Sequence, residues 1–166
     1  NRGIWFSQAM PKFVFMAWLS ADRLSTLGRI AKWNPGIDTT CVLCKGGFES
    51  RNHLFFECSY TGEVWEFLVK GILCNSFTNS WSEIMEILTD LNREKKSLFC
   101  IRYAFQAVRY AVWRERNKLR HGDKLLPLSV LKRMIDKGIR NRITLLSRHG
   151  VKGMEGLMQY WFSTRM

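Results

Sequence analysis

The chain has 166 residues, of which 46% are hydrophobic and 13% aromatic. This length and composition suit a single domain with a substantial buried core, and they exclude a largely disordered protein. No apolar stretch reaches the roughly 18 residues that are needed to cross a bilayer, so we expect no membrane partner.

The formal net charge of +12 is unevenly distributed along the chain. Residues 1–90 carry 8 Lys/Arg and 9 Asp/Glu, a balance of −1, whereas residues 91–166 carry 18 Lys/Arg and 5 Asp/Glu, a balance of +13. A basic half of this kind favours a polyanionic partner, most often RNA or DNA and otherwise an anionic membrane surface. The alternative is a solvated basic face that has no dedicated partner.

The N-terminal part predicts two helices and an irregular loop. Pro11 opens the first helix, because the first helical position tolerates a residue without an N–H group. Ser25 caps the second helix, which reaches Trp33 and ends at the turn sequence of residues 34–36. Residues 37–52 show no hydrophobic period, so something other than a packed face must order them.

Three shorter helices are predicted in the middle of the chain. The first runs from about Asn52 to Cys58, and the second carries apolar residues on one face from Val64 to Leu73. The third starts at Ser80 or Ser82 and continues to Leu91.

The clearest periodicity follows, over residues 98–119. Apolar residues recur there at spacings of three and four, with Glu115 as the one polar member of the series. This pattern predicts a long amphipathic helix that closes at His121-Gly122. Its other faces carry several arginines and lysines.

A last long helix opens at Pro127 and places Met134, together with five Leu and Ile side chains up to Leu146, toward the core. From Gly150 onward the chain either docks on the helices or belongs to a truncated neighbouring unit. The predicted fold is therefore all-α: a small helical domain with an irregular loop, followed by two long basic amphipathic helices. We divide it into an N-terminal helical region (1–75), a helical region with basic faces (76–149) and a tail (150–166).

Four residues in the loop and the helix after it have the spacing of metal ligands. The pattern is Cys41-x2-Cys44-x8-His53-x4-Cys58, and Gly46 and Gly47 let the loop reverse after the first pair. Three sulfur ligands and one nitrogen with no open position describe a structural zinc site, so we expect one Zn²⁺ per chain. The loop is then zinc-clipped, and residues 1–75 form a zinc-binding helical region. Such a site contributes on the order of 10 kcal/mol to folding, enough to order an otherwise featureless loop.

Two alternatives to a zinc site are four unrelated buried residues and a redox Cys-x-x-Cys pair. The redox alternative has no βαβ context and leaves His53 and Cys58 without a role. Cys74 and Cys100 lie on apolar helix faces and are expected to be buried thiols. An odd number of cysteines, three of them clustered, favours a reducing compartment and not secretion.

Several stretches resemble a known family, the plant reverse transcriptase zinc-binding domain. The resemblance rests on Trp5, Pro11-Lys12, Phe15, Trp18-Leu19, Arg23 to Thr26 and Arg29, then on Cys41-Val-Leu-Cys44, Glu49, His53-Leu-Phe-Phe-Glu-Cys58 and Trp65. The later Trp113-Arg-Glu-Arg-Asn117 also looks like a stretch that often follows this domain. Ser25 departs from the family, which commonly has Pro at this position.

This resemblance implies a module from the C-terminal region of a non-LTR retrotransposon (LINE-type) polyprotein, beside a reverse transcriptase domain. It also implies contact with RNA or DNA, and a nuclear or cytoplasmic location. Many copies of such genes are decayed, so a retroelement relic is one alternative that the resemblance implies.

No catalytic constellation is visible in the sequence. The aspartates occur singly, no phosphate-binding Gly loop appears, and Ser, Cys and His do not group outside the metal cluster. We therefore expect a non-catalytic zinc-binding module that contacts nucleic acid through basic helices; the alternative is a structural or protein-interaction module, or a retroelement relic. The expected nucleic-acid-binding residues are Arg102, Arg109, Arg114, Arg116, Lys118, Lys132, Arg133, Lys137, Arg140 and Arg142.

Overall fold

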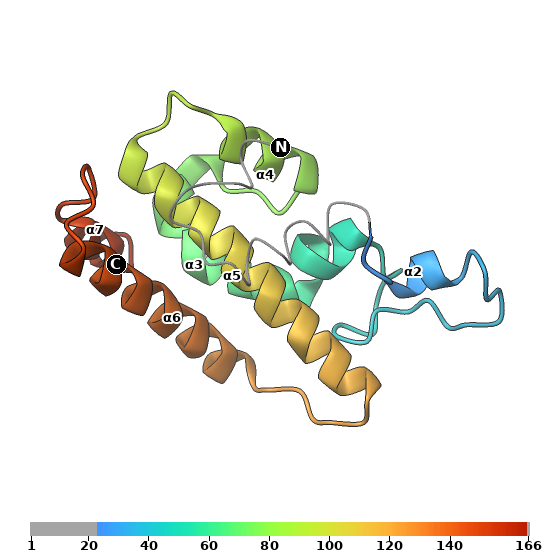
Figure 1. Cartoon of the computed structure of the whole chain (residues 1–166). Coiled ribbons are helices and arrows are strands. Elements are labelled where there is room, and N and C mark those ends of the chain that lie inside the picture. The colour runs from blue at the N-terminus through green and yellow to red at the C-terminus, as the bar shows by residue number, and fades with distance from the viewer. Residues whose placement is uncertain (1–22, 166) are drawn as a thin grey trace.

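The computed structural model describes residues 23–165 (Figure 1). All regular elements in this part of the chain are helices, and a single β-bridge joins Thr40 to Phe48. The elements are α2 (Leu27–Ile30), the π-helical turn η1 (His53–Glu57), α3 (Ser59–Leu73), the 3₁₀ turn η2 (Cys74–Ser76), α4 (Trp81–Thr89), α5 (Lys95–Arg120), α6 (Leu128–Arg148) and α7 (Leu157–Ser163). The all-α prediction is confirmed, and the helix predicted from Pro11 lies outside the described residues. None of the helices described is both long and apolar enough to span a membrane.

Helix α5 is the central element of the fold (Figure 1). The Glu94 side chain accepts hydrogen bonds from the backbone N–H groups of Lys96 and Ser97, so it satisfies two of the unpaired donors at the helix start. The predicted apolar series is buried from Leu98 to Val112, and its polar member Glu115 is fully buried too. The long helix expected over residues 98–119 is therefore confirmed.

Helix α6 lies beside α5 and packs on both α5 and α3. Its buried stripe of Leu131, Ile135, Ile139, Ile143 and Leu146 follows helical spacing. Met134 was expected in this stripe, but its side chain is 46% exposed at the edge of the α5–α6 interface.

Helix α7 docks the C-terminal residues on the rest of the molecule. Trp161 is fully buried, and its indole N–H donates to Asp136 of α6 over 2.9 Å. The Arg165 guanidinium lies 3.8 Å from the Trp161 ring centroid and donates to the Phe67 carbonyl. The chain passes so close to α3 that a Cβ atom built on Gly71 would lie 1.8 Å from the Thr164 carbonyl oxygen. The C-terminal residues up to Arg165 therefore dock on α3 and α6.

Three further expectations about individual residues are wrong. Helix α2 ends at Ile30, so Trp33 lies in the following turn and is 63% exposed. Helix α4 ends at Thr89, which leaves Leu91 71% exposed. Cys74 is exposed because the chain turns there with a positive φ of 50°. Cys100 is buried as expected, and burial raises the pKa of its thiol to about 12.

An aromatic cluster joins the metal-binding segment to the helices. Phe56 stacks on Phe105 of α5 with ring centroids 5.3 Å apart, and it meets Trp65 of α3 edge-on at 5.0 Å. Trp81 of α4 completes the cluster, 5.9 Å from Phe105. The hydrophobic core is continuous from the loop around Cys41 to α7, so residues 23–75 share one core with residues 76–149.

Candidate metal centre

The loop that carries Cys41 and Cys44 is held by its own backbone. The N–H of Cys41 donates to the Gly47 carbonyl over 2.7 Å, and the N–H of Lys45 donates to the Cys41 carbonyl over 2.9 Å. Lys45 has a positive φ of 59°, and the N–H of Gly46 then points at the Cys44 sulfur from 3.4 Å. An N–H group directed at a thiolate stabilises its negative charge.

Gly47 is needed for close approach and not for an unusual backbone angle. A Cβ atom at this position would lie 2.7 Å from the His53 ring, so only glycine leaves room for the imidazole. The backbone of the first ligand loop therefore forms one wall of the site.

The second pair of ligands comes from η1. The N–H of Cys58 donates to the carbonyl of His53 over 2.7 Å, a bond that spans five residues. This π-type turn brings side chains five positions apart to the same side of the chain, where an α-helix would separate them by about 140°. Leu54, Phe55 and Phe56 between the ligands are fully buried, and their packing fixes the turn.

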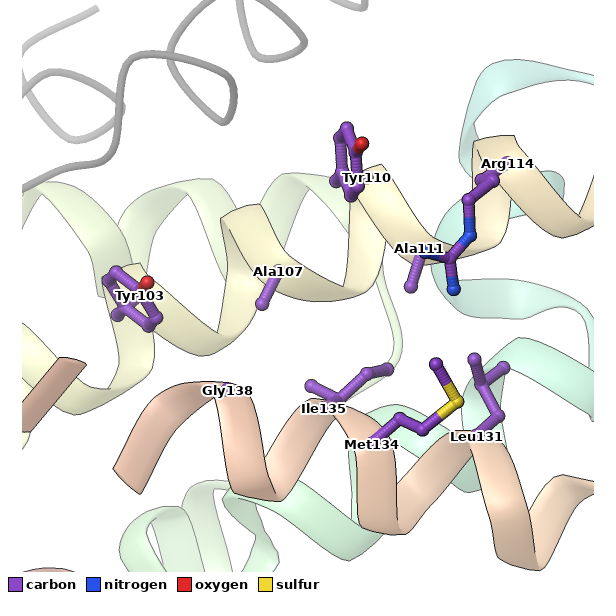
Figure 2. A pocket seen from close by; sticks show the side chains of 9 residues that line it. All are labelled: Tyr103, Ala107, Tyr110, Ala111, Arg114, Leu131, Met134, Ile135 and Gly138. Atoms are coloured by element: carbon purple, nitrogen blue, oxygen red, sulfur yellow. The ribbon is translucent and has the colours of Figure 1, made fainter. Parts of the chain in front are cut away.

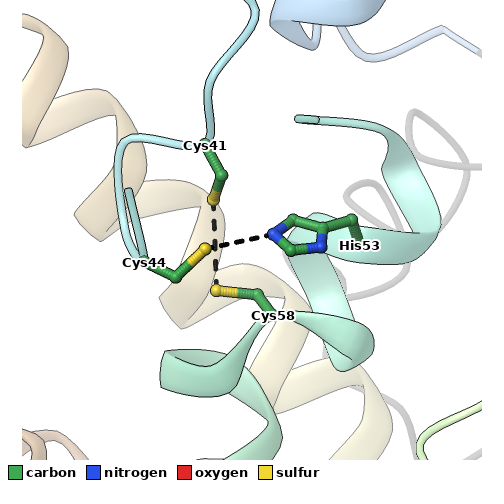
Figure 3. Close-up of side chains that lie close together, drawn as sticks. All are labelled: Cys41, Cys44, His53 and Cys58. Carbon is green, nitrogen blue, oxygen red and sulfur yellow. Dashed lines mark hydrogen bonds between the residues drawn. The ribbon is translucent and has the colours of Figure 1, made fainter. Parts of the chain in front are cut away.

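The four side chains converge on one point (Figure 3). All four ligand atoms lie within 4.8 Å of one another; the Cys41 and Cys58 sulfurs are 4.0 Å apart, and the Cys44 sulfur is 3.2 Å from His53 Nε2. A disulfide would need about 2.05 Å between the sulfurs. Zn–S bonds of about 2.3 Å in a tetrahedron place two sulfurs roughly 3.8 Å apart. The geometry and the donor set fit a closed structural zinc site.

Hydrogen bonding between the thiols distributes their protons unequally. The hydrogen bond to Cys58, together with burial, raises the pKa of Cys41, and the same bond lowers the pKa of Cys58. The metal-free pair therefore keeps a proton on Cys41 at neutral pH. A bound Zn²⁺ would be held by three thiolates and a neutral imidazole, so that proton must leave on binding.

A buried ion pair fastens the metal-binding loop to α5. Glu49 is fully buried, and its Oε1 accepts from Arg116 Nη2 at 2.6 Å and from the Leu27 N–H at 2.8 Å. Arg116 also donates to the Ser25 carbonyl over 3.1 Å and lies 4.7 Å from the Trp113 ring centroid. One pair of side chains thus connects α2, the metal-binding loop and α5.

Residues 1–65 match the model of a protein family described as zinc-binding in reverse transcriptase. The match includes all four converging residues, and it supports a reverse transcriptase zinc-binding domain in this part of the chain. No curated protein and no solved structure matches the chain significantly. Together, the cluster and the family match support one structural zinc ion bound to Cys41, Cys44, His53 and Cys58.

Of the ten expected nucleic-acid-binding cations, three make structural contacts inside the fold and seven lie at least partly on the surface. Arg109 and Arg116 are only 1% and 2% exposed, which removes them from the residues that could contact a phosphate. The Arg109 guanidinium lies between 4.8 and 5.4 Å from the centroids of Phe55, Trp81 and Phe105. Arg102 donates twice to the Leu88 carbonyl and caps the C-terminus of α4.

The other seven cations lie at least partly on the surface. Arg114 and Lys118 form ion pairs with Glu115, Lys132 pairs with Glu63, and Arg140 pairs with Asp136. The other three cations of this group, Arg133, Lys137 and Arg142, are exposed or half-buried on α6.

The structural arginines have a regular spacing, which places them on one stripe but does not by itself mark that stripe as buried. Arg102, Arg109 and Arg116 are seven residues apart, so they share one stripe of α5, and that stripe faces α4 and the metal-binding loop. The fully buried Glu49 stands out in the sequence only through the family resemblance, and its pairing with Arg116 becomes visible in three dimensions.

Proposed function

We propose that this chain is a non-catalytic zinc-binding module of a non-LTR retroelement reverse transcriptase, and that it contacts RNA or DNA through the exposed basic residues of α5 and α6. The observation that carries the proposal is the family match, joined to a closed Cys₃His cluster. Four protein ligands leave no position for a substrate or an activated water, so the metal stabilises the fold and takes no part in chemistry.

The charge distribution supports the choice of partner. Much of the excess of +13 over residues 91–166 lies on the surface, because Arg120, Lys124, Arg133, Lys137 and Arg148 are all exposed. Positive side chains on two neighbouring helices attract phosphates without reading base sequence.

A titration of labelled RNA and DNA at several salt concentrations tests this function. About six phosphate contacts would give a slope near −5 in log K against log salt concentration. A double variant, Arg133→Glu with Lys137→Glu, should weaken binding at least tenfold. The matched control, Lys70→Glu with Lys152→Glu, makes the same change in net charge at exposed lysines outside α5 and α6. A slope near zero, or equal affinities for the two double variants, would contradict the proposal.

An apolar groove favours a second candidate, a structural or protein-interaction module. Figure 2 shows this groove between α5 and α6, where Leu131 and Met134 reach toward Ala111 and Arg114. Its volume is about 140 Å³, and Met134 leaves an apolar surface exposed at its edge. If the module binds only protein at this groove, the wild type and both double variants will show no nucleic-acid binding.

A further inference from the structure

The two most exposed aromatic side chains of the described residues lie together beside the metal-binding loop. Trp33 is 63% exposed and Phe48 57%, and both line a groove of about 530 Å³ between α2 and the segment that follows the first zinc ligands. Large aromatic rings are normally buried, and exposed ones in one groove indicate a binding surface.

Contacts with α2 and the burial of the next residue hold Phe48 in place. The Phe48 ring lies against Gly28, where a Cβ atom would come within 2.4 Å of it. The Gly28 N–H donates to the Glu49 carbonyl over 3.1 Å, and the Glu49 carboxylate is buried against Arg116. Since successive residues of this extended segment point to opposite sides, burial of Glu49 holds Phe48 outward. A ring fixed in this way loses little conformational entropy when a ligand stacks on it.

Cations surround the two rings. Arg29, Lys32 and Arg51 line the groove, and none of the described residues lining it is acidic. The Arg51 guanidinium lies 4.4 Å from the centroid of the Trp81 ring, which fixes its charge at the rim of the groove. The groove thus combines exposed π-faces with a positive potential.

We propose that this groove binds an unpaired RNA or DNA strand, with bases stacked on Trp33 and Phe48 and phosphates facing Arg29, Lys32 and Arg51. Stacked bases use the rings and phosphates use the cations, whereas an apolar peptide would use only the rings. The inference rests on the proposed function for the class of partner. It adds a second site, on the zinc-binding side of the molecule, and it specifies an unpaired strand.

Fluorescence anisotropy with labelled oligouridine, oligothymidine and a hairpin duplex tests the proposal. Trp33→Ala and Phe48→Ala should each weaken binding of the single strands about tenfold, and leave duplex binding within twofold of the wild type. Phe162→Ala is the matched control, because Phe162 is 51% exposed on α7, at the opposite end of the molecule from α2 (Figure 1). Trp33 is exposed and lies outside the hydrophobic core, so Trp33→Ala remains decisive even if Phe48→Ala loses zinc or melts early.

The Arg133→Glu, Lys137→Glu variant separates this inference from the proposed function. If Trp33→Ala and Phe48→Ala bind single strands like the wild type while the α6 variant binds weakly, the groove proposal is overturned and the basic helices remain. If the aromatic variants lose affinity while the α6 variant does not, the groove is the binding site and the basic helices are not. A wild-type protein that binds none of the three probes overturns both.

Discussion

At the scale of single residues, the pair formed by Glu49 and Arg116 connects the metal-binding loop to the helices. Both side chains are desolvated, and the guanidinium hydrogen-bonds Glu49, Ser25 and Asn117. A buried pair of this kind adds little net stability over an apolar pair, but loss of one partner leaves an uncompensated charge inside the protein.

Glu49→Gln should therefore lower the free energy of unfolding by about 3–5 kcal/mol, since Arg116 would keep its charge in the core without a counter-ion. Glu66→Gln is the control, because Glu66 forms an exposed i,i+4 pair with Lys70 that contributes less than about 1 kcal/mol. Chemical denaturation at a fixed zinc concentration measures both. Equal losses of unfolding free energy in the two variants would show that breaking the buried ion pair costs no more than breaking the exposed one.

Cys58→Ser should abolish stoichiometric zinc binding, because a neutral hydroxyl is a poor substitute for a thiolate ligand. Elemental analysis should give one zinc per wild-type chain and per Cys74→Ser chain, since the Cys74 thiol is exposed and outside the cluster. Chelation should also remove the cooperative thermal transition of the wild type. Retention of one zinc by Cys58→Ser would show that the cluster does not bind it as proposed.

The affinity for zinc should fall as the pH falls. The pKa of Cys41 is raised, so the metal-free protein holds a proton there at neutral pH, and zinc must expel it. Each proton released changes the affinity about tenfold per pH unit, so log K should rise with pH with a slope of at least about one near neutrality. Competition with a chromophoric chelator at several pH values measures this slope, and a flat profile would contradict the expected protonation of the free site.

At the scale of elements, the metal cluster and the two long helices could be predicted, and the turns between ligands could not. Periodic apolar residues define α5 and α6 because a long helix must bury one continuous stripe. The π-type turn of η1 was not predicted, because a spacing of five between His53 and Cys58 suits both a helical turn and a loop. Arg109 and Arg116 look like surface cations on a helix, and only their partners on other elements make them core residues.

The docking of α7 on α3 depends on a glycine. Gly71→Val should displace the chain at Thr164, with a loss of about 1–3 kcal/mol and faster hydrogen exchange over Leu157–Ser163. Gly138→Ala is the contrasting change, because a Cβ atom at Gly138 meets nothing within 4 Å, and alanine favours a helix interior by up to about 1 kcal/mol. If Gly71→Val keeps wild-type exchange in α7, the close approach to Thr164 is not needed for docking.

At the scale of the whole molecule, the part that matches the family does not contain all of its own packing partners. Phe56 stacks on Phe105, and Glu49 pairs with Arg116; both partners lie beyond residue 65. Sequence periodicity gave no sign of this dependence, because it reports which face of a helix is apolar and not which element covers it.

A fragment of residues 1–75 should therefore bind zinc without folding cooperatively. Elemental analysis would find the metal, whereas near-ultraviolet circular dichroism would lack the signal of packed aromatic rings, and heating would give a broad transition in place of the sharp one of the full chain. A sharp melting transition for the fragment would show that the aromatic cluster and the buried ion pair are dispensable for this region.

The distance in sequence between Glu49 and Arg116 also imposes an order of events during synthesis. The four zinc-binding residues lie close together in the sequence, from Cys41 to Cys58, so they can meet soon after Cys58 leaves the ribosome. Arg116 follows Glu49 by 67 residues, a delay of about 3–13 s at roughly 5–20 residues per second. We therefore expect the nascent chain to bind its metal while the Glu49 carboxylate is still hydrated, and the emergence of α5 to bring the metal-bound loop into the core.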